Sequence, residues 1–282
     1  MFTTNPFFEL SGFISPIAMQ IYVIAMVLLV VGGTVLDMIH KKSAQYFFEN
    51  SKKAQKNATR TVSAGEKASI AVKTVANEVL TSAEFQNPKR RASHLLMMYG
   101  FVLFVATTAI MIFGYVGPDA TTPVILPLLW HLGALMLCIG GYWFWFFIRV
   151  DLFSDAKPWY RLARADLFIV SMLLTATFAL IWSFLQSTGA SAATLFFALF
   201  IGAATVLFGS VLWSKFAHMF FKPAAAFQKR MTKADGSMEN PPEIPDLSDP
   251  ATHERYPDIP EYLGKNPPNM GLGIKRESPN HY

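Results

Sequence analysis

Two histidines lie at the ends of long apolar stretches, where side chains of one helix can face those of another. His94 opens one stretch in RASHLLMMYGF, and His218 closes another in SKFAHMFFKP. Two neutral imidazoles on opposed helices are the axial ligands of a low-spin b-type haem. The chain has no Cys-x-x-Cys-His motif for covalent haem attachment. The pattern predicts one haem b with its iron bound by His94 and His218. The alternative is that each imidazole simply meets lipid headgroups.

The residues around these histidines suit a haem. Gly100 leaves room for the macrocycle, and Phe101 and Phe216 offer an apolar wall. Four basic residues lie where haem propionates would emerge and need cations: Arg90, Arg91, Lys215 and Lys222. A second interpretation of Arg91 and Lys215 is equally open, because basic residues are common at the inner ends of membrane spans.

A third histidine lies at the opposite end of the apolar stretches. His131 follows Pro127 and Trp130 at the start of its stretch. An imidazole there can bond a quinone oxygen, so His131 is a candidate quinone-site residue. A histidine beside a tryptophan is also typical of the membrane interface, and that alternative stays open.

Composition predicts a membrane protein. Of 282 residues, 52% are hydrophobic and only 15% are charged, against about 25% charged in a typical soluble domain. The single cysteine, Cys138, excludes a disulfide framework or an iron–sulfur cluster built by this chain alone. No nucleophile with a base and no phosphate-binding loop is present, so a soluble-type enzyme is not expected.

Five segments are long enough to cross a bilayer, which takes about 20 apolar residues. They are Ile17–Leu36, His94–Val116, Val124–Ile148, Leu167–Leu185 and Ala193–Phe221. The prediction is therefore an all-α, five-span bundle. Its domains are an N-terminal segment at 1–16, a membrane domain at 17–223 with a long loop at 39–93, and a tail at 224–282.

The basic residues predict the orientation of this bundle. All 24 Lys and Arg residues fall in the first loop (Lys41 to Arg91), the third loop (Arg149 to Arg164) or the segment from Lys215 onward. Because basic loops stay on the cytoplasmic side, the N-terminus is expected to be periplasmic and the C-terminus cytoplasmic in a bacterial inner membrane.

Three polar segments are expected on the cytoplasmic side. The capping-box pattern Ser63-x-x-Glu66 predicts a helix near 64–84. The third loop, with Trp159 and Tyr160, looks interfacial. The tail from Pro223 has Pro-Pro pairs and few aliphatic residues, so we expect it to be extended or disordered unless a partner orders it.

The two histidine motifs resemble those of the gamma subunit of respiratory nitrate reductase and related membrane cytochrome b subunits, over roughly residues 15–223. The resemblance implies five spans with the N-terminus outside, and a haem bound by the histidines that open span two and close span five, here His94 and His218. The second pair of histidines, which binds an outer haem in nitrate reductase, is absent. The long first loop and the tail indicate a divergent branch, similar overall to the membrane anchors of adenylylsulfate reductases in sulfur-oxidising bacteria.

These features predict a membrane anchor that transfers electrons between a cytoplasmic redox enzyme and the quinone pool, and the resemblance implies an enzyme of the adenylylsulfate reductase type. The expected partners are iron–sulfur or flavoprotein subunits, membrane lipid and quinone, and not nucleic acid. The alternative is a haem-free anchor that recruits a soluble redox complex through its tail. A transporter is disfavoured because the spans lack buried acid–base pairs.

Overall fold

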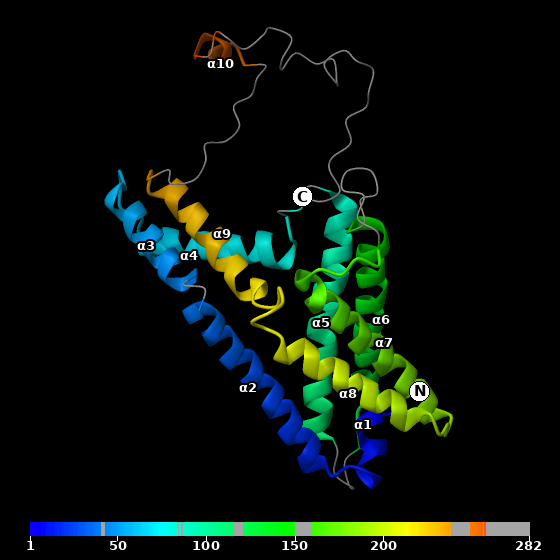
Figure 1. Ribbon diagram of the computed structural model, residues 1–282. Helices are drawn as coiled ribbons and strands as arrows, with labels where there is room; N and C mark the ends of the chain where they lie inside the picture. Colours follow the sequence, from blue (N-terminus) through cyan, green and yellow to red (C-terminus); the bar gives the residue numbers. More distant parts are fainter. Residues whose placement is uncertain are drawn as a thin grey trace, which may run out of the picture.

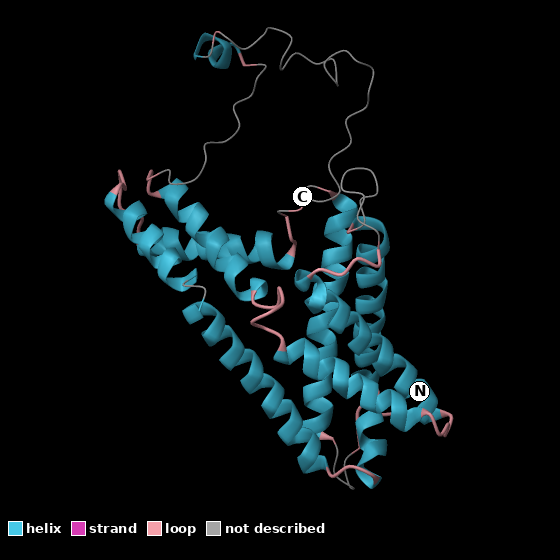
Figure 2. Ribbon diagram, in the orientation of Figure 1, coloured by secondary structure: helices cyan, strands magenta, loops and turns pink. Residues whose placement is uncertain are grey.

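The described part of the chain is helical throughout in this computed structural model, with no strand among the described residues (Figure 2). The structure describes residues 1–40, 43–83, 85, 87–115, 121–149, 159–237, 249–255 and 257. Figure 1 shows the long helices Pro88–Gly114 and Ile125–Trp143 side by side, Pro16–His40 inclined away from them, and further helices gathered at one end. The all-α prediction is confirmed for these residues.

The described residues form helices in the following order. Their bounds are α1 Pro6–Glu9, η1 Leu10–Gly12, α2 Pro16–His40, α3 Ser43–Lys56, α4 Ala64–Thr74, the π-helical η2 Val75–Leu80, α5 Pro88–Gly114, α6 Ile125–Trp143, the π-helical η3 Phe144–Ile148, η4 Arg164–Asp166, α7 Leu167–Ser187, α8 Ala193–Gly209, α9 His218–Ala234 and α10 Pro250–Arg255.

Four of these helices are long and apolar enough to cross a membrane. They are Pro16–His40, Pro88–Gly114, Ile125–Ile148 and Arg164–Ser187, and they match the first four expected spans closely. Successive members run in alternating directions between two ends of the molecule (Figure 1). We call these the α1 end, where α1 packs, and the basic end, where α5 begins and carries Arg90 and Arg91 in its first turn.

Helices α5 and α6 pack against each other at very short range through three glycines. A Cβ on Gly100 would lie 2.9 Å from the carbonyl oxygen of Gly133, and one on Gly133 would lie 2.7 Å from the amide nitrogen of Phe104. Farther along, Ser93 Oγ donates a hydrogen bond of 2.9 Å to the carbonyl of Gly140. Gly100 therefore faces α6, and the expectation that it leaves room for a haem ring is wrong.

An aromatic core fills the α1 end. Phe7, Trp130 and Trp182 are each at most 1% exposed, and Phe7 packs on both tryptophans with ring centroids 5.4–5.7 Å apart. Asn5 caps α1 through a 3.0 Å bond from Phe7 N and also bonds the carbonyl of Tyr115 at 3.1 Å. The first dozen residues thus close this end of the bundle.

The expected fifth span is interrupted. Helix α8 has 17 residues, about 26 Å at 1.5 Å per residue, against a hydrocarbon core of about 30 Å. Turns from Ser210 to Ala217 follow it before α9 begins at His218. Ser214 Oγ accepts a hydrogen bond from the amide of Phe216 here, a local bond that competes with helix formation. A single helix from Ala193 to Phe221 is not confirmed.

Helix α9 continues past Pro223 to Ala234, which contradicts the expectation of an extended tail for residues 224–234. Proline is better tolerated near the start of a helix than in its middle, and Pro223 is only the sixth residue of α9. Most of the remaining tail lies outside the described residues, apart from α10.

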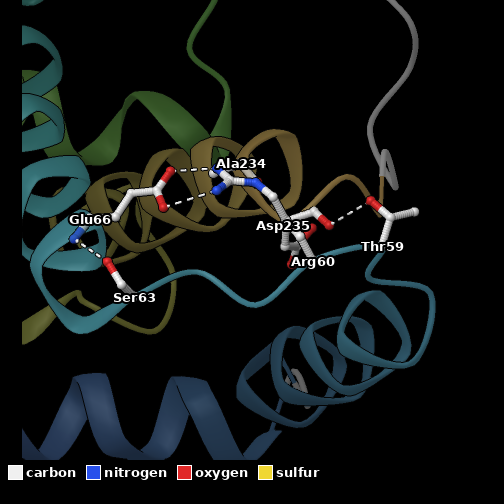
Figure 3. Close-up of polar contacts among 6 residues, drawn as sticks. All are labelled: Thr59, Arg60, Ser63, Glu66, Ala234 and Asp235. Carbon is white, nitrogen blue, oxygen red and sulfur yellow. Dashed lines mark hydrogen bonds and ion pairs between the residues drawn. The ribbon is translucent and has the colours of Figure 1, made fainter.

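Helices α3, α4 and α9 are joined by contacts between residues 59–66 and 234–236, which we call the clasp (Figure 3). The backbone amides of Thr59 and Arg60 both donate to the carbonyl of Asp235, at 2.9 and 3.2 Å. Arg60 Nε donates to the carbonyl of Ala234 at 2.5 Å, and its guanidinium forms two bonds to Glu66. Hydrogen bonding to Glu66, reinforced by its charge, raises the pKa of Arg60 further above physiological pH.

The expected helix start at Ser63 is confirmed, with one difference. Ser63 Oγ accepts a hydrogen bond of 3.2 Å from the amide of Glu66, and the helical path from Ala64 runs through α4 and η2 to Leu80. The Glu66 carboxylate pairs with Arg60, so the structure uses Glu66 to join the loop to α9 as well as to start α4.

A second ion pair joins the ends of α6 and α7. Arg149 Nε donates to Asp166 Oδ1 at 2.9 Å, with a further bond from Nη2 to Oδ2. The two side chains are only 12% and 15% exposed. Arg149 also stacks over the ring of Trp145, 4.2 Å from its centroid. In the described part of the third loop, Trp159 and Tyr160 are exposed, as an interfacial position requires.

Candidate functional site

His94 lies in the second turn of α5, which starts at the basic end because Asn87 caps the helix and Pro88 is its first residue. The imidazole is half-buried. Its Nδ1 is 3.0 Å from the hydroxyl of Ser82, and its ring centroid is 4.9 Å from that of Phe85. Both partners come from the turn that precedes α5, so this turn covers one side of the imidazole.

His218 is the first residue of α9. Its Nδ1 bonds the backbone carbonyl of Lys215 within the turn that separates α8 from α9. The ring meets Phe168 of α7 edge-on, with centroids 5.7 Å apart. The break after α8 therefore changes the setting of this histidine, which starts a helix where the sequence predicted that it would end one.

Two contacts link the segments that carry the two histidines, and each joins one helix to the turn that precedes the other. Phe101, seven residues after His94 and so on the same face of α5, meets Phe216 with centroids 6.4 Å apart. Lys222, four residues after His218, places its ammonium 5.1 Å from the ring centroid of Phe85, which itself packs on His94. The surroundings of His94 are thus in contact with the surroundings of His218.

The hydrogen bonds of both imidazoles suit metal ligation. A backbone carbonyl can only accept, so His218 donates from Nδ1–H to Lys215 and its Nε2 carries the lone pair. The Ser82 hydroxyl can accept in the same way from His94 Nδ1. Histidines that bind a metal commonly donate their other N–H to such an oxygen. The donor set therefore fits a bis-histidine haem.

The four cations expected from the sequence differ in how directly they contact this site. Arg91 Nε donates to the carbonyl of Thr81 at 2.7 Å, which ties it to the turn before α5. Lys215 is exposed, and its carbonyl serves His218. Arg90 lies 5.4 Å from the Phe85 centroid, on the ring that also receives Lys222. Arg90 and Lys222 are thus the cations linked most directly to His94.

Two residues of the site, Ser82 and Phe85, were not anticipated from the sequence. Neither lies in an apolar stretch, and Ser82 contacts His94 only because its backbone adopts a left-handed conformation with φ of 47°. No residue pattern in this segment predicts a left-handed backbone at Ser82.

His131 is placed far from the other two histidines, in the aromatic core of the α1 end. It is 1% exposed. Its Nδ1 is 2.7 Å from the carbonyl of Pro127, and its Nε2 is 2.8 Å from the hydroxyl of Ser183. Phe2 meets its ring at 5.0 Å. A quinone oxygen would have to replace Ser183 as the partner of Nε2.

An apolar groove with a volume of about 320 Å³ lies between α7 and α8. Its lining is almost entirely hydrocarbon, with Ser171 as the single hydroxyl, and the lining residues are Leu167, Val170, Ser171, Leu174, Phe178, Ala198, Leu199, Gly202, Ala203 and Val206. Such a groove suits a hydrocarbon chain. Among the described residues, no group of three or more His, Cys, Asp or Glu side chains gathers to bind a metal ion.

No family model matches the chain, and neither the curated proteins nor the solved structures contain a significant match.

Proposed function

We propose that this chain is a membrane anchor and electron-transfer subunit that holds one haem b between His94 and His218. It would link a cytoplasmic redox enzyme to membrane quinone. The observation that carries the proposal is a pair of imidazoles, on α5 and at the start of α9, whose surrounding segments are linked by Phe101–Phe216 and Phe85–Lys222, each with Nδ1 engaged by an oxygen.

In this proposal the haem supplies a one-electron carrier, and the chain supplies binding and surroundings. His94 and His218 would be the residues that hold the iron. The rings of Phe101 and Phe216 exclude water from its face. The cations expected from the sequence would compensate the charge of the propionates; they are Arg90, Arg91, Lys215 and Lys222.

We further propose five crossings with the basic end in the cytoplasm of a bacterial cell, α8 and the turn after it forming the fifth. The distribution of Lys and Arg supports this orientation. An acidic iron–sulfur or flavoprotein subunit would then meet the basic end, as would anionic lipid. An adenylylsulfate reductase is the candidate enzyme by resemblance. Quinone would bind at His131 or pass its isoprenoid chain into the groove between α7 and α8.

One observation favours the second candidate, a haem-free anchor that recruits a soluble complex. The clasp joins the first loop to α9 through hydrogen bonds to the carbonyls of Ala234 and Asp235, two of them donated by backbone amides and one by Arg60 Nε (Figure 3). An ordered helical platform of this kind can bind a partner whether or not a haem lies beneath it. In that case His94 and His218 would be ordinary residues of the inner membrane interface.

A pair of single substitutions tests the haem proposal. His94→Ala and His218→Ala are each expected to insert into the membrane and to lose the b-type spectrum, because one remaining imidazole cannot ligate both faces of the iron. His40→Ala is the matched control, since His40 is an exposed histidine at the last position of α2. A normal spectrum and haem content in either of the first two variants would refute the pairing.

A further inference from the structure

Ser82 combines three features that are unusual for a serine in a connecting turn. Its φ is 47°, the one positive value that a non-glycine residue shows among the described residues. It is 1% exposed. Its hydroxyl lies 3.0 Å from Nδ1 of His94. Residues other than glycine adopt the left-handed backbone conformation at an energetic cost, and residues with this strain cluster at functional sites.

The turn that holds Ser82 is fixed to α5 by side chains on the same helix as His94. Arg91 Nε donates to the carbonyl of Thr81 at 2.7 Å, and the Tyr99 hydroxyl donates to that of Leu80 at 2.7 Å. The amide of Phe85 donates to the carbonyl of Ser82 at 3.1 Å. These bonds set the position of Ser82 relative to α5, and therefore relative to the imidazole.

The segment that leads into this turn is a π-helix, η2 Val75–Leu80. Single π-helical turns are rare and are frequent at functional sites. A π-helix has more residues per turn than an α-helix, so the backbone leaves η2 in a different direction from the one that an α-helix would give it. The left-handed Ser82 follows within two residues of its end.

We infer that Ser82 is a positioning residue for His94. Its hydroxyl accepts a hydrogen bond from Nδ1–H, which selects the tautomer with Nε2 as the iron-binding nitrogen and increases electron donation from the imidazole to the metal. This inference rests on the proposed function, because it assigns Ser82 a role toward the haem iron. It extends the ligand pair by a residue that tunes the site without touching the iron.

Two variants separate the hydroxyl from the backbone conformation. Ser82→Ala removes the hydroxyl and keeps the conformational strain. Ser82→Gly removes the hydroxyl and also relieves the strain, because glycine adopts positive φ readily. Ser93→Ala is the control. Ser93 is fully buried and adjacent to His94 in sequence, but its hydroxyl bonds Gly140 on the α6 side of the helix.

The measurements are haem content, the midpoint potential of the haem and the low-spin EPR spectrum of the full-length protein. Loss of the bond to Nδ1 weakens electron donation and disfavours Fe(III). Both Ser82 variants should therefore raise the potential together, by up to a tenfold change in the Fe(III)/Fe(II) equilibrium, about 59 mV for one electron. Ser93→Ala should leave the potential and the EPR spectrum unchanged.

The outcomes are distinguishable. Haem-loaded Ser82→Ala and Ser82→Gly proteins with the wild-type potential and EPR spectrum would overturn the positioning role and leave the haem proposal standing. A shift in Ser82→Ala that Ser82→Gly restores would assign Ser82 a purely backbone role, which also overturns the inference. A folded wild-type protein that binds no haem would overturn the proposed function and this inference with it.

Discussion

Substitution of Gly133 by alanine tests how α5 and α6 meet. The added Cβ would lie 2.7 Å from the amide nitrogen of Phe104, 2.9 Å from the carbonyl oxygen of Gly100 and 3.1 Å from Phe104 Cα. Nonbonded heavy atoms prefer separations of about 3.5–4.0 Å. All three neighbours are backbone atoms, so no side chain can rotate away and the helices themselves must separate.

The cost follows from that separation. Moving the helices apart by roughly 0.5–1 Å forfeits a quarter to a half of the dispersion attraction across the interface. Overpacking of this kind costs about 1–3 kcal/mol. At about 2 kcal/mol, the unfolding midpoint should fall by roughly 4–8 °C for a chain of this size.

The single cysteine provides the assay. Cys138 lies on α6 and is half-buried, so a fluorogenic maleimide reports its exposure when the detergent-solubilised protein is heated. Gly202→Ala is the matched control, because a Cβ there meets no atom within 4 Å and alanine has the higher helix propensity. Its midpoint should equal or exceed that of the wild type. An unchanged midpoint for Gly133→Ala would refute the close α5–α6 packing.

Three further substitutions probe other contacts. Gly236→Ala should open the clasp, because Gly236 has φ of 75° and its Cβ would lie 2.1 Å from Thr59 Oγ1; faster limited proteolysis between α3 and α4 is the readout, and an unchanged cleavage rate would contradict the clasp. Asp166→Asn should cost about 2 kcal/mol, because it weakens the charged bonds that Arg149 donates; a wild-type unfolding midpoint would argue against the pair. Asn5→Ala should cost about 1 kcal/mol through loss of the α1 cap and speed proteolysis of the N-terminal segment, whereas unchanged protection would show that the cap is dispensable.

The first four apolar helices could be predicted from the sequence because hydropathy over about 20 residues is a strong signal. The start of α4 could be predicted as well, since Ser63 is followed by Glu66 at capping distance. What the spacing could not give was the partner of the Glu66 carboxylate, which pairs with Arg60 and not with the backbone of Ser63. That pairing depends on α9, which lies more than 150 residues later in the chain.

The interruption of the fifth segment was missed for a physical reason. Apolar side chains continue through residues 210–217, and two of them, Val211 and Phe216, are almost fully buried. Burial in turns and burial in a helix give the same signal. The local bond from Phe216 N to Ser214 Oγ becomes visible only in three dimensions.

The same limit applies to the candidate site. His94 and His218 were identified because histidine is rare in apolar stretches and has a specific chemistry. The role of Gly100 was mistaken, because a glycine admits a close helix as readily as a cofactor, and here it admits α6. Ser82 depends on a backbone angle that its residue type disfavours.

The most direct test of the central claim is the dithionite-reduced minus oxidised spectrum of the purified full-length protein, combined with a pyridine haemochrome assay of haem per chain. We expect a b-type spectrum and one haem per chain, with His94 and His218 as the residues that hold the haem. A folded protein produced with ample haem that shows no b-type signal would contradict it, and the haem-free anchor would then be the better description.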